Sequence, residues 1–386
     1  MVDIKRMKVL MFGLDRSMLD PGSRPFRRIA AYAALLDELH IIVPASRSLP
    51  APAVSQGNIT VHPVRFRFRA AYFFRAASLG IRIVRERDFS PASDRITAQD
   101  PFLAGFPAYF ASRRTGIPLE LQAHIDFFNP RFFCESPVQF AQYCAGRFLY
   151  PRADGVRAVS GEIGRYMIGR LRIPPDRVAV IPVFTDCAAI AAAPVRASLR
   201  AAFPDFSFIS FVPARLVPQK NIHMIIRAVR LALPHCPGLG LVITGQGPSG
   251  PSLLRAARGI ERSVVFLPWS SETVSHYKTC DCFILASRYE GWGMTVVEAM
   301  AAGAPVVATA VGCVPDLVSD GVHGRIIAQN DAHALAGVIR DLYGDASLRA
   351  RLGSAASAAA ARLVPRTPSE HARAVVGALA RIGWHF

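Results

Sequence analysis

The chain has 386 residues, 51% of them hydrophobic, and its 45 Lys and Arg outnumber 28 Asp and Glu to give a formal net charge of +17. This length is more than one hydrophobic core usually serves and predicts two domains, while the apolar content excludes a largely disordered chain. The excess of positive charge favours anionic partners, namely nucleic acid, acidic lipid or phosphorylated small molecules.

Short β-branched runs alternate with helical patterns along the chain, which is typical of parallel sheets in α/β proteins. In the first half, strands are expected at 8–13, 39–45, 59–66, 95–99, 118–124, 155–160 and 178–183, with helices near 25–37, 101–114, 136–150 and 161–170. In the second half, strands are expected at 207–215, 239–245, 264–269, 282–287 and 305–310, with helices at 221–233, 250–258, 294–303 and 332–341. The two series predict two Rossmann-like domains with parallel sheets.

The two series are separated by residues 184–205, where Ala and Pro are frequent and the sequence looks like a hinge. We therefore place an N-terminal domain at 1–185 and a C-terminal domain at 186–365. A last amphipathic helix is expected within 366–386, and the N-terminal domain is the candidate surface for its docking.

The start of that last helix carries capping signals. Thr367 is a plausible N-cap, Pro368 suits the first turn, and Glu370 occupies the capping-box position.

No segment has the length and composition of a membrane span or a signal peptide. The longest uncharged run, 299–315, is interrupted by two glycines and two prolines and predicts a turn, a strand and a loop. The seven cysteines include no Cys-x-x-Cys pair, which argues against a zinc site or a disulfide framework. We expect a cytoplasmic protein whose only link to a bilayer is peripheral attachment to the inner face of the cell membrane.

The richest segment is 286–307, where a buried strand ends, a glycine-rich turn follows and a helix begins. Such a helix start points unpaired N–H groups and a positive dipole end at an anion such as a diphosphate. Glu290 and Glu298 lie eight positions apart, so both can face one ligand and accept hydrogen bonds from sugar hydroxyls. The turn residues expected at the ligand are Gly291, Trp292, Gly293, Met294 and Thr295. By periodicity alone, an ordinary strand–turn–helix explains the pattern equally well.

A loop after the first strand of the second series carries two cations, Arg215 and Lys220. Together they could clamp a diphosphate and neutralise charge on a leaving group; the plainer interpretation is a solvated loop. The next loop holds Gly245 and Gly247 in a G-x-G-x-x-G pattern. A dinucleotide site also requires an acidic residue at the end of the following strand, and 264–269 offers none, which argues against NAD.

Two polar residues of the first series, His124 and Asp126, follow the strand at 118–124. The carboxyl ends of parallel strands are where such sheets bind ligands, although a lone His is more often structural.

Residues 65–87 carry the arginines 65, 67, 69, 75, 82, 85 and 87. The alternation RFRFR predicts a strand with one cationic and one aromatic face, and the residues after it suit a basic amphipathic helix. Either this is a solvated face beside core aromatics, or it adsorbs to an anionic membrane surface. The aromatics lack a recognisable nucleic-acid module, so we expect no nucleic-acid partner.

Glu290 and Glu298 resemble the Glu-x7-Glu signature of retaining glycosyltransferases of family 4, which have the GT-B fold. Trp292 stands where Phe is more usual. The resemblance implies two Rossmann-like domains facing a central cleft, with Glu290 on the donor sugar and Glu298 on the nucleotide ribose. The loop with Arg215 and Lys220 resembles the family's phosphate-holding loop.

The resemblance extends, more loosely, to other segments. It places Gly245 and Gly247 in a turn beside the nucleotide and His124 against the donor sugar, with Asp126 a less certain match. Gly13 falls where the family has a glycine-rich turn under the donor, but only Gly13 and Gly22 of that turn remain in this chain.

The resemblance implies transfer of a sugar, with retention, from a UDP- or GDP-linked donor. The basic first half and the missing signal peptide point to a glycan or lipid-linked glycan acceptor in polysaccharide biosynthesis. The catalytic candidates are Glu290, His124, Arg215 and Lys220. The resemblance also implies that no metal and no cofactor besides the donor substrate are needed, and the absence of an Asp-x-Asp motif agrees with this. Two alternatives stay open: a nucleotide-sugar epimerase of the same fold and a basic nucleic-acid-binding α/β protein.

Overall fold

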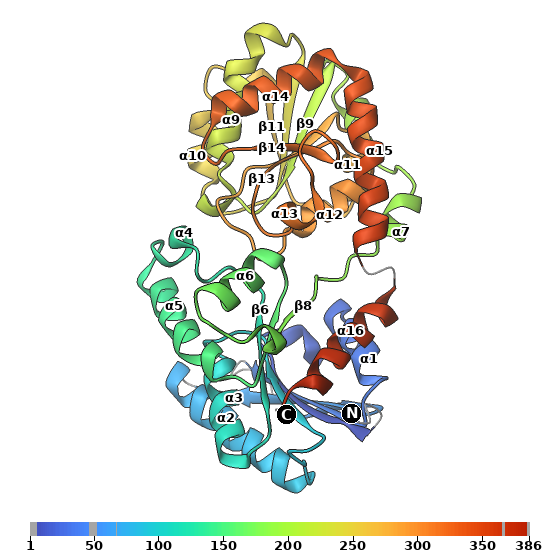
Figure 1. The fold of residues 1–386 in the computed structure, drawn as a ribbon. Coiled ribbons are helices and arrows are strands. Elements are labelled where there is room, and N and C mark those ends of the chain that lie inside the picture. The colour runs from blue at the N-terminus through green and yellow to red at the C-terminus, as the bar shows by residue number, and fades with distance from the viewer. Residues whose placement is uncertain (1–5, 46–51, 67, 365–366, 384–386) are drawn as a thin grey trace. The chain divides into compact units, whose positions relative to one another are not determined.

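The computed structural model describes residues 6–45, 52–66, 68–364 and 367–383 (Figure 1). The chain forms two compact units. Unit 1 comprises Met1–Pro182 and Thr367–Phe386, and unit 2 comprises Val183–Arg366. The first boundary lies three residues before the position expected from the sequence, and the chain returns to unit 1 at its C-terminal end.

Unit 1 is built on an eight-stranded sheet of order β3-β4-β2-β1-β5-β6-β7-β8. All neighbouring strands are parallel except β3 and β4, which form a short antiparallel edge that the sequence did not indicate. The strands are β1 (Lys8–Phe12), β2 (Glu38–Ala45), β3 (Val54–Gln56), β4 (Ile59–Arg65), β5 (Arg95–Ala98), β6 (Leu119–Ala123), β7 (Gly155–Ala158) and β8 (Val178–Val180).

Helices cover the sheet of unit 1, and the helices expected from the sequence are all present. They are α1 (Arg24–Ala33), α2 (Arg69–Glu86), α3 (Gly105–Thr115), α4 (Pro130–Phe133), α5 (Pro137–Leu149), α6 (Gly161–Gly169) and α16 (Pro368–Arg381). Figure 1 shows α16 beside α1. Apolar side chains of α16, such as Val375 and Leu379, are buried in one cluster with Met11 and Ile41 of the sheet. The Thr367 side chain accepts a hydrogen bond from the Glu370 N–H at 3.1 Å, which confirms the predicted N-cap.

The RFRFR stretch does not form the expected strand. β4 ends at Arg65, which pairs with Ala45, the last residue of β2. Phe66 and Phe68 belong to no strand, and α2 begins at Arg69. The alternating cationic face is therefore wrong, whereas the basic helix after it is confirmed. Arg67 lies outside the described residues.

Unit 2 is built on a six-stranded, fully parallel sheet of order β11-β10-β9-β12-β13-β14. This is the doubly wound order, in which the chain starts in the middle and reverses direction between β9 and β12. The strands are β9 (Phe208–Pro213), β10 (Leu239–Thr244), β11 (Val264–Leu267), β12 (Cys282–Leu285), β13 (Val306–Thr309) and β14 (Gly324–Ile327).

Helices cover this second sheet, and the sequence did not indicate α7, α8, α11, α13 or α15. The helices are α7 (Cys187–Ala192), α8 (Leu199–Ala202), α9 (Ile222–Ala232), α10 (Gly250–Ala256), α11 (Thr273–Thr279), α12 (Met294–Ala301), α13 (Val314–Leu317), α14 (Ala332–Gly344) and α15 (Ala346–Leu363). The buried cluster of unit 2 joins β9, β10 and β12 to α9 and α14. No helix among the described residues is both long enough and apolar enough to cross a bilayer.

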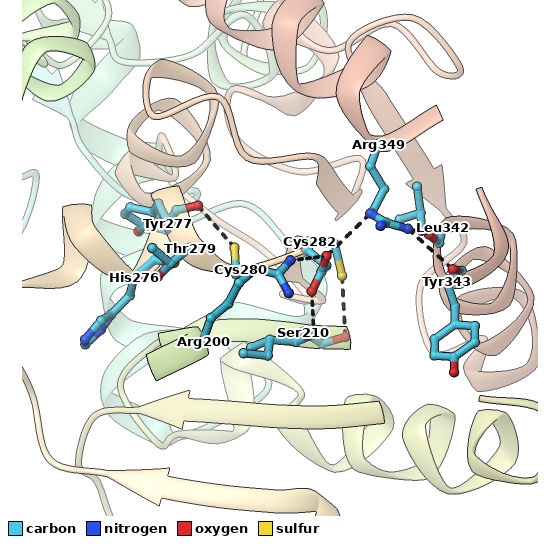
Figure 2. A network of polar contacts seen from close by, with 12 residues as sticks. Arg200, Ser210, His276, Tyr277, Thr279, Cys280, Cys282, Leu342, Tyr343 and Arg349 are labelled. Carbon is cyan, nitrogen blue, oxygen red and sulfur yellow. Dashed lines mark hydrogen bonds and ion pairs between the residues drawn. The ribbon is translucent and has the colours of Figure 1, made fainter. Parts of the chain in front are cut away.

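Most of the segment expected to act as a hinge is packed on unit 2. The Thr279 hydroxyl accepts from the Leu199 N–H at 3.0 Å, and Arg200 pairs with the buried Asp281 at 2.5 Å. Figure 2 shows Arg200 on one side of this group of polar contacts and Arg349 of α15 on the other. Arg349 lies 3.4 Å from the same Asp281 carboxylate. Asp281 thus anchors α8 and α15 at the amino-terminal edge of the sheet.

Candidate functional site

In unit 2, the loops that follow β9 and β12 lie side by side, because these strands are neighbours where the winding direction reverses. Ligands of open α/β sheets bind at the carboxyl ends of the strands at this point. The β9 loop supplies Arg215 and Lys220, and the β12 loop supplies Glu290. The topology therefore brings two segments that are distant in sequence to one edge of the sheet.

Lys220 and Glu290 are in direct contact. The Lys220 Nζ lies 2.5 Å from Oε1 of Glu290, and their side chains are 17% and 9% exposed. Lys220 ends a short 3₁₀ turn, Pro218–Lys220, and the next residue, Asn221, has φ 52°. The cation predicted for the donor phosphates and the carboxylate predicted for the donor sugar thus form a largely buried ion pair.

The two loops are also joined through their backbones by Gln219. Its carbonyl accepts from the Arg288 N–H at 2.9 Å, and its side-chain amide donates to the Tyr289 carbonyl at 2.9 Å. Lys220 is the next residue in the chain and Glu290 follows Tyr289. These two hydrogen bonds between the loops therefore fix the position of the ion pair. The sequence alone did not reveal them.

Two glycines are needed to shape the β12 loop. Gly293 is the N-cap of α12 with φ 91°, a conformation that only glycine adopts without strain. Gly312 has φ 61°, and a Cβ there would lie 2.5 Å from the Trp292 carbonyl oxygen. That carbonyl accepts from the Cys313 N–H at 2.7 Å. The loop after β13 thus supports the loop that carries Glu290.

The remaining turn residues take different positions. Trp292 is 4% exposed, and its Nε1 has no hydrogen-bond partner among the described residues, whereas Met294 is 42% exposed. Thr295 lines a small pocket together with Lys220, at the ends of β9 and β12. The first N–H groups of α12 begin at this pocket, and helix starts of this kind attract anions. Gly291 is half-buried within the same turn.

Glu298 lies in the second turn of α12. Its Oε2 accepts from the Tyr277 hydroxyl at 3.1 Å. Burial raises the pKa of Glu298, and the hydrogen bond from Tyr277 partly opposes this. Tyr277, on α11, is itself fully buried, and no motif in the sequence indicated it. Glu298 therefore has an internal partner and is held in one orientation.

Gly245 and Gly247 lie against the loop that carries Arg215. Cβ atoms at these glycines would lie 2.0 Å from the Ala214 carbonyl oxygen and 2.4 Å from the Leu216 carbonyl oxygen. The requirement for glycine thus comes from close contact between two loops. Arg215 itself is exposed, and its side chain makes no ion pair with the described residues.

Three predicted residues belong to unit 1 and lie at the carboxyl ends of β1 and β6. Gly13 is buried, and its N–H donates to the Ile42 carbonyl at 2.9 Å. His124 is exposed, and its Nε2 lies 2.8 Å from Oε1 of Gln122. Asp126 is 6% exposed and accepts from the Phe128 N–H at 3.3 Å. Burial raises the pKa of Asp126, and hydrogen bonds from Asn129 and Phe128 partly oppose this. The carboxylate is thus bonded within its own turn.

No group of three or more His, Cys, Asp or Glu side chains within the described ranges could hold a metal ion. In the described part of unit 2, this edge carries Arg215 and Lys220 in the loop after β9 and Arg288 in the loop after β12, together with the start of α12.

Two family models match the chain. The model described as glycosyl transferase 4-like domain matches residues 25–183, and the model described as glycosyl transferases group 1 matches residues 200–359. A D-inositol 3-phosphate glycosyltransferase of Stackebrandtia nassauensis is 31% identical over 284 residues, which cover 68% of this chain and 63% of that protein. The chain thus spans less than two thirds of the length of this curated relative.

Solved structures share the fold. The structure of Anabaena HepE in complex with UDP aligns with a TM-score of 0.73 and 22% identity, covering 97% of this chain and 100% of that chain. Sucrose-phosphate synthase from Thermosynechococcus elongatus aligns with a TM-score of 0.71 and 17% identity, covering 93% of this chain and 95% of that chain. These likenesses confirm the predicted GT-B fold with two parallel-sheet α/β units.

Proposed function

Because the chain belongs to the glycosyltransferases that these two family models describe, we propose that it is a retaining hexosyltransferase using a nucleoside-diphosphate sugar. The observation that supports this most directly is the contact between Lys220 and Glu290 at the carboxyl ends of β9 and β12. A cation for the phosphate end and a carboxylate for the sugar end of one substrate meet there. The start of α12 lies at the same edge.

In this proposal the protein supplies electrostatic stabilisation and orientation. The bond between the sugar C1 and the diphosphate oxygen breaks while the acceptor oxygen bonds to C1 on the same face. The acceptor proton passes to an oxygen of the departing diphosphate. Lys220, Arg215 and the N-terminus of α12 neutralise the charge that develops on that group, which is the part that a metal ion plays in other enzymes. No metal is required.

We propose a UDP-linked donor, with GDP as the alternative nucleotide. The neighbouring HepE structure was solved with UDP and with UDP-glucose. A thermal-shift series with UDP, GDP and their sugar conjugates tests this, because a ligand at 100 times its Kd stabilises the folded state by about 2.7 kcal/mol. We expect a UDP compound to raise Tm with EDTA present. Unchanged Tm with every nucleotide would contradict the donor site.

Substitutions locate the donor site. Lys220→Ala and Glu290→Ala are expected to abolish transfer while circular dichroism remains native-like. Arg227→Ala is the matched control, because Arg227 is exposed on α9 of the same unit. Normal turnover in purified Lys220→Ala or Glu290→Ala rules out the assignment. The anomeric configuration of the product, read by NMR of the first-formed glycoside, tests retention.

We further propose a glycan acceptor carried on a lipid, in polysaccharide assembly, with unit 1 resting on an anionic membrane surface. The support is a surface in which exposed Phe74, Phe110 and Phe148 lie among arginines. The rings of Phe73 and Phe110 lie 5.2 Å apart, so α2 and α3 join in one surface. The arginines exposed on or next to these helices and α5 are Arg75, Arg82, Arg85, Arg87, Arg113, Arg114, Arg147 and Arg152.

Exposed aromatics among cations suit the interface of an anionic bilayer. Co-sedimentation with phosphatidylglycerol vesicles is expected at low salt and to weaken at high salt, whereas phosphatidylcholine vesicles bind little. Phe74→Ser with Phe110→Ser should reduce binding. Leu254→Ser is the control, since Leu254 is similarly exposed on unit 2. Equal binding to both vesicle types would remove the membrane proposal and leave transfer to a soluble acceptor.

A further inference from the structure

A buried amide on β6 connects His124 to the interior of unit 1. Gln122 is 2% exposed, and its side chain contacts three polar groups. Its Nε2 donates to the Thr97 hydroxyl at 2.8 Å. Its Oε1 lies 2.5 Å from Nη2 of Arg157 and 2.8 Å from Nε2 of His124.

The chemistry of these partners determines which atoms carry protons. A guanidinium only donates hydrogen bonds, so the Gln122 atom facing Arg157 must be the oxygen. The same oxygen faces His124, and an amide oxygen only accepts. His124 Nε2 must therefore carry the hydrogen. In the neutral ring the other nitrogen, Nδ1, then has a free lone pair.

Arg157 is well placed to fix this orientation. Gln122 and Arg157 are opposite each other in the register of β6 and β7. Arg157 is 6% exposed, and its Nε lies 3.5 Å from Oε1 of the buried Glu120, which shares its strand face with Gln122 and His124. The cation is thus held between two β6 side chains and cannot leave the Gln122 oxygen without exposing buried charge.

We propose that Gln122 and Arg157 are positioning residues that hold His124 as the Nε2–H tautomer, so that Nδ1 accepts a hydrogen bond from a sugar hydroxyl. The second half of this statement rests on the proposed function. Nδ1 has no partner among the described residues, and the ring is exposed beyond the carboxyl end of β6. A hydroxyl group is the natural donor to such a nitrogen, since Nδ1 has a lone pair and carries no hydrogen.

The surroundings keep the ring neutral, as this role requires. Burial of the imidazole, then the charges of Arg157 on β7 and Arg28 on α1, lower the pKa of His124. The ring edge remains open to solvent, which limits the contribution of burial, but both arginines act in the same direction. A protonated ring would have no lone pair at Nδ1 to offer.

The tautomer is measurable without any sugar. In the full-length protein labelled with ¹⁵N-histidine, long-range ¹H–¹⁵N correlation at pH 8 distinguishes a protonated from an unprotonated ring nitrogen. The His124 signals are identified by their loss in His124→Gln. We expect a protonated Nε2 and an unprotonated Nδ1. A protonated Nδ1, or rapid exchange between the two forms, would overturn the proposal.

Variants test whether Gln122 sets the tautomer. Gln122→Met removes the acceptor at similar volume and should give a mixture of tautomers, whereas Gln122→Glu keeps an acceptor and should retain protonated Nε2. Thr97→Val is the matched control, since it removes a contact of the same amide but leaves the Arg157 and His124 contacts. An unchanged His124 spectrum in folded Gln122→Met contradicts the positioning role.

Kinetics then separate the positioning role from the proposed function. If the wild-type protein transfers sugar, Gln122→Met should lower kcat/KM about tenfold, the scale of one lost hydrogen bond, while Gln122→Glu and Thr97→Val stay closer to wild type. A changed tautomer with unchanged kcat/KM overturns the link to the sugar. Absence of transfer by the wild type counts against the proposed function, while the spectra still decide the tautomer.

Discussion

The Lys220 ammonium lies 2.5 Å from the Glu290 carboxylate, and each group neutralises the other. A buried pair of this kind gains Coulombic energy but has lost hydration. A donor whose phosphates bind Lys220 and whose sugar hydroxyls bind Glu290 must compete with this ion pair for both side chains. We infer that Lys220 and Glu290 are held in place by this ion pair rather than as two separately exposed charges.

Breaking that pair should destabilise unit 2. We expect Lys220→Ala to lower the free energy of unfolding by about 1–3 kcal/mol, because Glu290 is left buried without its cation. The measurement is urea unfolding of Lys220→Ala, Glu290→Gln and the double variant, which gives the coupling energy directly. Arg227→Ala serves as the surface control. Additive effects in the double variant would show that the contact contributes nothing to stability.

The loop after β13 should be sensitive to a single methyl group. Gly312→Ala places a Cβ 2.5 Å from the Trp292 carbonyl oxygen at positive φ, so both strain and steric overlap act. Gly321→Ala is the matched control, with φ +71° and open space around the new Cβ. We expect the free energy of unfolding to fall by about 1 kcal/mol in the control and by at least about 2 kcal/mol in Gly312→Ala, as measured by thermal unfolding. Equal costs would mean that the loop moves aside freely.

Unit 1 should lose stability in mild acid through a histidine pair. Nδ1 of His40 lies 3.1 Å from Nε2 of His62, and the other nitrogen of His40 lies 2.8 Å from a Glu38 carboxylate oxygen. Burial, then His40 and Arg87, lower the pKa of His62 to about 4. An unfolded His titrates near 6.5, so the unfolded state binds more protons between those values.

The contribution of His62 is therefore complete above about pH 6.5 and is lost as pH falls towards about 4. We expect a loss on the order of 1–2 kcal/mol, reduced by the partial exposure of the ring. Urea unfolding between pH 4 and pH 7.5 measures it. His62→Gln should flatten the dependence, and His235→Gln, at an exposed position, should not. Identical slopes in the wild type and His62→Gln would exclude His62 as the cause.

Replacing Asp281, the anchor of α8 and α15, should lower the free energy of unfolding more than replacing an exposed Asp. Its side chain is 2% exposed, contacts Arg200 and Arg349, and accepts from the Ile209 N–H at 2.8 Å. We expect Asp281→Asn to lower the free energy of unfolding by about 3 kcal/mol. Asp341→Asn is the control, because Asp341 is 57% exposed and pairs with Arg325 at 3.5 Å; a change under about 0.5 kcal/mol is expected. Similar losses in both variants would refute the anchor.

The elements with strong local signals were predictable. Apolar runs bounded by Gly or Pro located the strands of both sheets other than β3 and β14, and the cap at Thr367 was visible as a motif. β3 and β14 were missed because Val54–Gln56 contains one apolar residue and Gly324–Ile327 contains two, which is too short an apolar run to indicate a strand. RFRFR was misassigned because its alternation suits a strand, whereas α2 already begins at Arg69.

The site was predictable in its residue types but not in its contacts. Motif spacing selected Lys220 and Glu290, yet their ion pair depends on the β9–β12 adjacency created by the winding order. Tyr277 beside Glu298 and Arg157 beside Gln122 are contacts across elements, determined by packing and strand register. A single sequence carries no local pattern for them.

The return of α16 to unit 1 has a consequence during synthesis. Unit 2 is one uninterrupted stretch, whereas unit 1 is incomplete until residues 367–383 emerge from the ribosome. Until then the apolar surface that Val375 and Leu379 cover stays open to solvent. The half of the protein that is translated first is thus the last to complete its fold. While the other half is translated, the nascent chain exposes an apolar surface that chaperones can bind.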